Sequence, residues 1–342
     1  MMITLGDGLL LAVLCLSSWL MSHGVRLYAL RANVVDVPSA RSSHSTTTPR
    51  GGGLAIVAAS ILAALWLWQQ ERLANLWLLA IYLPAGLLGL FSFVDDHKPL
   101  SRRLRFFVHL ACACLLLYLL PKDIYLPLAG YQIPIASFWM APLSVLAITW
   151  MINLYNFMDG IDGIAGAEAI SVLLGLQTII YLQGGTLDIQ LLSLSAIALG
   201  FLWINWAPAK LFMGDIGSCF LGLILVACAC YCAHQYQINL WASLILLAAF
   251  IVDASWTLLY RMLTGQAWNE GHRSHSYQIL SRKWQSHSSV VCAMLLFNTL
   301  WLLPLALLST KAPEWAAAIF ALACLPFLTI GLKFKAGHNS EL

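Results

Sequence analysis

A polar stretch interrupts a mostly apolar sequence near its middle. It reads Asn153-Leu-Tyr-Asn156-Phe-Met-Asp159-Gly-Ile-Asp162-Gly-Ile-Ala-Gly166. Two carboxylates and two amides stand among three glycines, and glycine lets a backbone approach a ligand closely. A charge at a membrane boundary can also simply cap a helix, but four polar side chains in this spacing favour a binding or catalytic site.

Two adjacent carboxylates, Asp95 and Asp96, begin another polar connection. Adjacent carboxylates repel each other unless a cation or a basic partner neutralises them. Mg²⁺ prefers oxygen ligands and is commonly held by one or two carboxylates together with substrate phosphates. The alternative is neutralisation by the basic residues that follow, of which Lys98 is the first.

Basic residues also precede a run of three glycines near the N-terminus. Arg41, His44 and Arg50 lie before residues 51–53, where an apolar run begins. These side chains, the backbone N–H groups and a helix N-terminus could together bind phosphate. The alternative is a basic flank that only sets the membrane topology.

Two later connections add further candidates. Asn205 is followed by Asp215, which stands between two glycines just before an apolar run, where it could bind metal or act only as a helix N-cap. His272, Arg273 and His275 lie close together in a loop. The two histidines could be ligands or phosphate donors, or simply solvated loop residues.

The composition is that of a polytopic membrane protein. Hydrophobic residues make up 61% of the 342 residues and charged residues only 10%, whereas soluble domains carry about 25% charged residues. We therefore predict an all-α fold in a single domain, residues 1–342, with about eleven transmembrane helices. The apolar runs are 3–21, 53–68, 73–93, 106–120, 136–152, 164–182, 189–206, 216–233, 238–260, 289–309 and 315–332.

The positive residues predict how these helices are oriented. Fifteen of the eighteen Lys and Arg residues fall in alternate connections and the C-terminal tail. Cytoplasmic loops are enriched in these residues, so the N-terminus should face out and the C-terminus the cytoplasm. The first run has its positive residues after it, which predicts a retained anchor instead of a cleaved signal peptide.

The polar candidates share the predicted cytoplasmic side although they come from five connections. A transporter is expected to place its charges near the bilayer midplane and often has internal repeats, and neither is visible here. The arrangement favours a metal-dependent site at the membrane surface. The candidates on this side are Asp36, Asp95, Asp96, Asp159, Asp162, Asp215, His272, Arg273 and His275.

All nine cysteines lie within predicted helices. Cys228, Cys230 and Cys232 suggest a metal site at first sight, but the spacing of two residues points neighbouring side chains to opposite helix faces. We interpret the cysteines as small apolar packing residues.

These motifs together resemble the polyprenyl-phosphate N-acetylhexosamine-1-phosphate transferases, glycosyltransferase family 4. The resemblance rests on Asp95-Asp96, the stretch from Asn153 to Gly163, Asn205 with Pro208-Ala-Lys-Leu-Phe-Met-Gly-Asp215-Ile-Gly-Ser218, and His272-Arg-Ser-His275. The match runs from Asp36 to His275 in the family's order and covers most of the chain.

The resemblance implies transfer of a sugar 1-phosphate from a cytoplasmic UDP-N-acetylhexosamine to undecaprenyl phosphate, with release of UMP. By analogy Asp215 binds Mg²⁺, with Mn²⁺ as an alternative ion, and Asp95 and Asp96 line the metal and lipid-phosphate site. Asn153, Asn156, Asp159 and Asp162 would contact the nucleotide or support the metal, and His272 to His275 would contact the sugar phosphate.

The resemblance also implies location and partners. Members of the family lie in the bacterial inner membrane with the active site facing the cytoplasm, so the bilayer is a partner, no nucleic acid is expected, and a homodimer is an alternative to a monomer. Muramoyl-peptide enzymes carry three successive histidines in the last motif, whereas here Arg273 and Ser274 separate two. The form in this chain is closest to initiators of Gram-negative O-antigen synthesis.

Two rival functions are distinguishable. A CDP-alcohol phosphatidyltransferase also uses Asp-Gly pairs at a membrane surface, but its longer Asp/Gly/Ala-Arg pattern is missing here. A non-enzymatic transporter or flippase would release no nucleotide and would tolerate the loss of Asp215. The motifs leave the identity of the UDP-sugar open.

Overall fold

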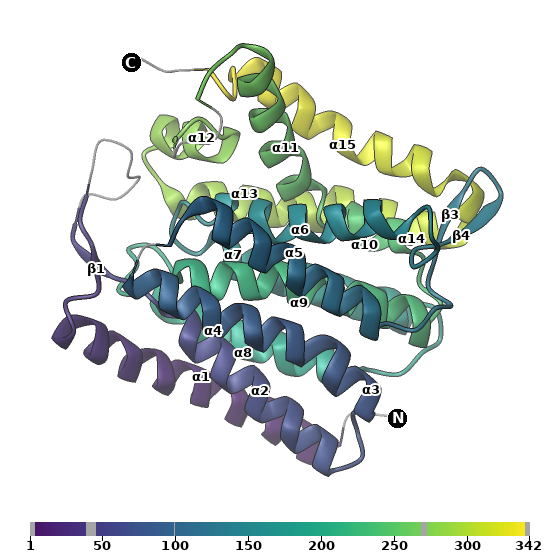
Figure 1. Ribbon diagram of the computed structural model, residues 1–342, viewed down its shortest axis with the longest axis horizontal. Coiled ribbons are helices and arrows are strands. Elements are labelled where there is room, and N and C mark those ends of the chain that lie inside the picture. The colour runs from purple at the N-terminus through teal and green to yellow at the C-terminus, as the bar shows by residue number, and fades with distance from the viewer. Residues whose placement is uncertain (1–3, 39–45, 99, 268–271, 339–342) are drawn as a thin grey trace.

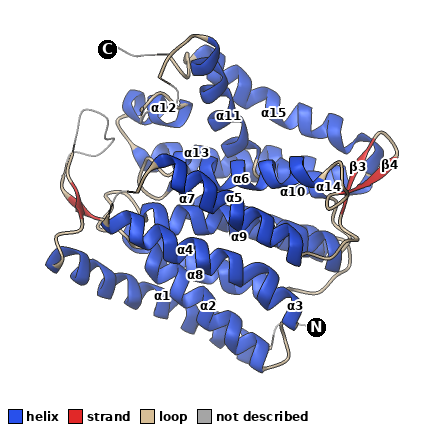
Figure 2. Ribbon diagram, viewed as in Figure 1, coloured by secondary structure: helices blue, strands red, loops and turns tan. Residues whose placement is uncertain are grey.

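Helices form nearly all the regular structure of the chain. A computed structural model describes residues 4–38, 46–98, 100–267 and 272–338. Strands occur in these ranges as two short antiparallel pairs, β1 with β2 and β3 with β4, drawn as arrows in Figures 1 and 2 where they are visible. The predicted all-α class is therefore confirmed.

The first part of the chain ends at the polar stretch that follows α6. Its elements are α1 (Leu5–Arg31), β1 (Val35–Asp36), β2 (Thr48–Pro49), α2 (Gly53–Gln69), α3 (Asn75–Trp77), a π-helical turn (Leu78–Tyr82), α4 (Leu83–His97), α5 (Arg102–Leu119), β3 (Tyr125–Leu128), β4 (Tyr131–Pro134) and α6 (Ala141–Met158).

The second part is helical throughout. Its elements are α7 (Ile164–Leu182), α8 (Ile189–Asn205), α9 (Gly214–Gln235), α10 (Leu240–Leu246), α11 (Ala248–Leu263), α12 (Ser276–Trp284), α13 (His287–Phe297), a π-helical turn (Asn298–Leu302), α14 (Leu303–Lys311), a 3₁₀ turn (Pro313–Trp315) and α15 (Ala316–Lys333).

Each predicted apolar run coincides with helical structure. Within the described ranges seven helices are long and apolar enough to cross a membrane, or eight if α10 and α11, which meet at a 72° bend, form one span. α2 and α8 are apolar but shorter, and α5 begins with three arginines in its first turn. The polytopic character is confirmed, whereas the count of eleven spans and their orientation stay predictions.

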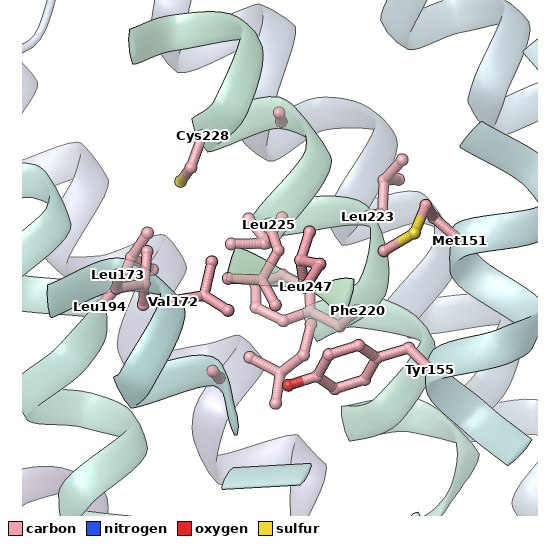
Figure 3. Close-up of a cluster of buried hydrophobic side chains, with 14 of the residues drawn as sticks. Met151, Tyr155, Val172, Leu173, Leu194, Phe220, Leu223, Leu225, Cys228 and Leu247 are labelled. Carbon is pink, nitrogen blue, oxygen red and sulfur yellow. The ribbon is translucent and has the colours of Figure 1, made fainter. Parts of the chain in front are cut away.

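α9 is the central helix of the protein. It packs against α2, α4, α6 and α7, and Figure 3 shows Phe220, Leu223, Leu225 and Cys228 among the buried side chains around it. A helix that is apolar on all sides can be buried on all sides. This explains why Cys228, Cys230 and Cys232 are all buried. Cys114 and Cys292 are exposed, so the interpretation of the cysteines as packing residues does not fit these two.

α1 contrasts with α9 because it lies at the periphery. It packs against α2 and α8, while Leu9, Leu16 and Leu20 on its other side are more than half exposed. Apolar side chains on an outer helix surface are typical of a face that contacts lipid. The outer surface of the helix bundle therefore agrees with a membrane environment.

The three glycines at residues 51–53 bring two helix starts together. Gly52 N–H donates to Phe212 O at 2.9 Å and Gly53 N–H to Met213 O at 2.8 Å. A Cβ atom on Gly53 would lie 2.1 Å from the backbone nitrogen of Gly217 in α9. These two N–H groups are therefore not free to bind phosphate, and phosphate binding by the other groups of this segment stays a prediction.

We predict that Gly53→Ala will destabilise the fold. The methyl group would meet the backbone of α9, which cannot move aside as a flexible side chain can, so we expect a loss of about 1–3 kcal/mol or more in the free energy of unfolding. Thermal unfolding in detergent measures this. Gly24→Ala in α1 is the matched control, because a Cβ there meets no atom within 4 Å; equal unfolding temperatures for both variants would contradict the prediction.

Candidate active site

Five connections that are distant in sequence meet at one end of the helix bundle. They are the segments between β1 and α2, α4 and α5, α6 and α7, α8 and α9, and α11 and α12. Side-chain and backbone bonds tie them together, as the following paragraphs describe. The β3–β4 hairpin lies at the opposite end (Figure 1). The predicted sharing of one side by the polar candidates is therefore seen in the structure.

Asp95 and Asp96 lie at the buried end of α4. Asp95 accepts a hydrogen bond from Leu100 N–H at 2.7 Å, and its other oxygen lies 3.3 Å from Arg105. Arg50 donates to the main-chain oxygen of Asp96 at 2.7 Å, and its guanidinium lies 3.8 Å from the Asp96 carboxylate. The pair is thus neutralised in part by two arginines from different segments.

Asp215 joins this pair from the first turn of α9. The same Arg105 nitrogen that contacts Asp95 lies 3.4 Å from Asp215 Oδ2. Asn156 donates to Asp215 Oδ1 at 3.0 Å and to Ser218 Oγ at 2.9 Å. Arg105 from α5 and Asn156 from α6 therefore hold Asp215 and leave its side chain one third exposed.

Gly214 shows how closely the start of α9 approaches α4. It has a φ of +74°, and a Cβ atom there would lie 2.7 Å from Asp96 Oδ2. Ile216 N–H points at that same carboxylate oxygen, 3.4 Å away. The glycine before Asp215 is therefore required both by the backbone conformation and by the adjacent carboxylate.

Asp162 forms the other side of the polar stretch. Ala209 N–H donates to its Oδ2 at 3.0 Å, and His287 Nδ1 lies 3.3 Å from the same oxygen. Asn205 is buried beside this loop and uses both ends of its amide on the backbone, accepting from Gly163 N–H at 3.1 Å and donating to Leu211 O at 3.0 Å. Asn205 thus ties the two loops together, and a direct contact with substrate stays a prediction.

The histidine loop packs behind this stretch. Tyr277 in α12 donates to Phe157 O at 2.9 Å. Asp253 of α11 accepts from Ser276 and Tyr277 N–H at 2.8 and 3.0 Å, so it caps the start of α12. His275 is buried at that helix start, and its ring centroid lies 4.9 Å from that of His272.

Both histidines are held in the neutral state. Burial, together with smaller electrostatic contributions from His275 and Arg261, lowers the pKa of His272 to about 3. Burial also lowers the pKa of His275 to about 4, although its contact with Asp253 acts in the opposite direction. Near pH 7 the pair can accept or donate hydrogen bonds but supplies no positive charge.

The remaining predicted residues have other surroundings. Asn153 donates to Thr149 O within its own helix at 2.7 Å. Lys98 is exposed at the end of α4, and Arg273 is partly buried beside Arg282, whose pKa its charge helps to lower. Arg41 and His44 lie outside the described residues. Roles in substrate binding for these residues stay predictions.

Asp159 experiences the combined charge of the site. Burial, followed by the negative charges of Asp215, Asp162 and Asp96 in that order of importance, raises the pKa of its carboxyl to about 7. Only Arg50 and Arg105 form ion pairs with this group of carboxylates in the part of the chain that the structure describes, apart from His287 at Asp162. The site is therefore short of positive charge.

The donor set suits a hard divalent cation. All of its charged oxygens are carboxylate oxygens, which Mg²⁺ prefers. A bound divalent cation would also supply the positive charge that the site lacks. Within the described ranges no three His, Cys, Asp or Glu side chains already converge as ligands. Binding of the ion by Asp95, Asp96 and Asp215 therefore stays a prediction.

Arg105 and His287 were not predicted as site residues. Arg105 follows two other arginines, and the sequence does not tell which of the three turns inward beneath the carboxylates. His287 lies 125 residues from Asp162, and nothing in its flanking sequence indicates the contact. Tyr277 was missed for the same reason.

This arrangement defines a class of protein: an integral membrane enzyme with a carboxylate-rich site at one end of its helix bundle. A family model described as "Glycosyl transferase family 4" matches residues 77–233. The chain belongs to this family, because it is also 31% identical over 319 residues to the "Probable undecaprenyl-phosphate N-acetylglucosaminyl 1-phosphate transferase" of Bacillus subtilis, a match that covers 90% of this chain and 86% of the relative.

Two further relatives have related names. The decaprenyl-phosphate N-acetylglucosaminephosphotransferase of Mycolicibacterium smegmatis is 28% identical, with 80% of this chain and 75% of the relative covered. The phospho-N-acetylmuramoyl-pentapeptide-transferase of Thermodesulfovibrio yellowstonii is 31% identical, with 60% and 64% covered. The family resemblance seen in the motifs is confirmed, and the chain is a transferase.

We predict that Asp159 makes stability depend on pH when no divalent cation is present. Its pKa is about 7 in the folded protein and 3.8 ordinarily, so its contribution to stability is fully present below pH 4 and is lost as the pH rises through 7. The loss is at most about 4 kcal/mol. Thermal unfolding in detergent with a chelator should show the decline between pH 5 and 8, and Asp159→Asn should flatten it; identical slopes in both proteins would contradict this.

Proposed function

We propose that this protein transfers N-acetylhexosamine 1-phosphate from a UDP-sugar to undecaprenyl phosphate and releases UMP, with Mg²⁺ as cofactor and Mn²⁺ as an alternative. The observation that carries the proposal is the meeting of Asp95, Asp96, Asp159, Asp162 and Asp215 at one end of a membrane helix bundle. A carboxylate-rich site there suits a diphosphate donor bound with a cation and a lipid-linked acceptor.

The relatives support this reaction class. The names of the Bacillus and Mycolicibacterium proteins state an N-acetylglucosaminyl phosphate and a polyprenyl phosphate, and these proteins align over 86% and 75% of their length. The muramoyl-pentapeptide enzyme aligns over 64%. The longer alignments with the N-acetylglucosaminyl enzymes and the split histidine motif together favour an N-acetylhexosamine over a muramoyl-peptide substrate.

The reaction brings anions together, so neutralisation and positioning should dominate its rate. An oxygen of the acceptor phosphate would form a bond to the sugar-bearing phosphorus as the bond from that phosphorus to UMP breaks. Asp215, with Asp95 or Asp96, would hold Mg²⁺, which when bound would offset charge on the diphosphate. Arg50 and Arg105 would offset charge on the acceptor, and Asn156 would keep Asp215 oriented.

The histidine loop would act without charge in this scheme. His272 and His275 are neutral near pH 7, so they would donate and accept hydrogen bonds at the sugar phosphate, and Arg273 is the cation of that motif. The concentration of Lys and Arg residues in alternate connections supports a cytoplasmic active site in the bacterial inner membrane, where the UDP-sugar is available. Initiation of O-antigen or of another cell-envelope polysaccharide would follow.

We predict that purified protein will release UMP from a UDP-N-acetylhexosamine only when undecaprenyl phosphate and Mg²⁺ are both present. Asp215→Asn should lower the rate at least 100-fold, because it removes the charge that holds the cation. Asp123→Asn, at the opposite end of the bundle, is the control. The assay should be run over a panel of UDP-N-acetylhexosamines that includes the muramoyl-pentapeptide derivative.

The rival functions give different results in that assay. Release of CMP from a CDP-alcohol would identify a phosphatidyltransferase. No nucleotide release with any donor, together with full function of Asp215→Asn, would identify a transporter.

We predict that Asp95 binds and orients and does not act as an obligatory base. The acceptor phosphate has a second pKa of about 6 and is mostly ionised at pH 7, while a carboxylate with a pKa of about 4 would take its last proton uphill by about 3 kcal/mol. Asp95→Asn should therefore stay impaired as the pH is raised from 7 to 9. Recovery of the rate at high pH with unchanged Mg²⁺ binding would establish the base role instead.

A further inference from the structure

A cavity of about 310 Å³ lies beside α12, and Met158 at the end of α6 and Ile164 at the start of α7 bring its wall next to the polar stretch. It is bounded by α11, α12, α13 and α15, and most of its walls are apolar side chains, among them Trp284, Met294, Phe297, Phe327, Ile330 and Phe334. Its volume is at the lower end of the range for ligand pockets, about 300–1,000 Å³. Asp253 contributes to its wall, but its two oxygens already accept from Ser276 and Tyr277. The interior therefore suits a hydrocarbon chain.

Positive side chains surround the rim of this cavity. The ammonium groups of Lys283 and Lys333 lie 5.0 and 5.9 Å from the ring centroid of Phe334, which lines the cavity. Arg282 lies on the opposite face of α12, because it is two residues away from both Leu280 and Trp284, which line the cavity. The rim thus presents cations around the entrance of an apolar space.

These cations have no carboxylate partners in the described part of the chain. Every ion pair found there involves other residues. Like charges gathered in this way are stabilised by an anion.

The position of the cavity suits a ligand from the membrane. α13 begins at His287 and α15 ends at Lys333 at the end of the bundle that carries the candidate active site (Figure 1). The cavity and its lysines therefore lie in the part of the bundle next to that end. A basic cluster beside membrane helices is typical of a site for anionic lipid.

We propose that this cavity binds an anionic glycerophospholipid of the surrounding bilayer. Its headgroup phosphate lies between Lys283 and Lys333, and one acyl chain fills the apolar space. The lipid lies between α12 and α15 and contacts both helices. Since α12 begins at Ser276, with His275 at its N-cap, the site supports the helix from which the histidine loop extends.

The test measures lipid binding to the purified full chain in a neutral detergent by native mass spectrometry. Dioleoyl phosphatidylglycerol should bind more tightly than dioleoyl phosphatidylcholine. Lys283→Gln with Lys333→Gln should weaken phosphatidylglycerol binding by about 25-fold, because each lysine contributes about fivefold. Lys122→Gln with Lys311→Gln, which removes the same charge at the opposite end, should leave it unchanged.

A second pair of variants tests the apolar part. Ala293 lines the cavity and Ala318 in α15 is exposed, so Ala293→Phe should weaken binding of the long-chain lipid while Ala318→Phe should not. All variants should keep the unfolding temperature of the parent protein, since none of them removes a packed side chain. Neither readout depends on the transferase reaction.

Three outcomes would overturn the proposal. Equal affinity for phosphatidylglycerol and phosphatidylcholine would remove the role of the cations. Equal affinity for dihexanoyl and dioleoyl phosphatidylglycerol would remove the role of the cavity. Tighter binding of undecaprenyl phosphate, weakened by the same three substitutions at Lys283, Lys333 and Ala293, would identify the cavity as a site for the acceptor instead.

Discussion

The structure depends on keeping several carboxylates close together at one end of an apolar helix bundle. Like charges at this separation repel strongly, and the neighbouring helices limit how far they can move apart. Two arginines reduce the repulsion, and Arg105 does so for Asp95 and Asp215 at once. The raised pKa of Asp159 shows that the compensation is incomplete. A cation bound with a phosphorylated substrate would complete it, so ligand binding and charge balance in this protein are coupled.

The close approach of α2, α4 and α9 makes this concentration of charge sterically feasible. Gly53 and Gly217 let two helix starts touch backbone to backbone, and Gly214 leaves room for the Asp96 carboxylate. Larger residues would move Asp215 away from Arg105 and Asn156. The apolar core around α9 keeps the helices in this arrangement, because the side chains in Figure 3 leave it no freedom to shift.

α12 links the carboxylates to the C-terminal part of the chain. Asp253 caps its first turn, Tyr277 donates to the end of α6, and Gly337 N–H donates to Ser274 O at 2.8 Å. The histidine loop is consequently supported on several sides. A lipid between α12 and α15 would add to this support from the membrane, and the occupancy of that site would then affect how firmly the loop is held.

The sequence by itself determined the class of the fold, the positions of the helical segments and the family, because long apolar runs and closely spaced polar motifs depend on local residue types. It also indicated that Asp95, Asp96, Asp159, Asp162 and Asp215 belong to one site. Only the tertiary structure decided that Arg105 bridges two of them, that His287 contacts Asp162, and that the glycines serve helix contact. These contacts join residues far apart in the chain, and their geometry depends on how the helices pack.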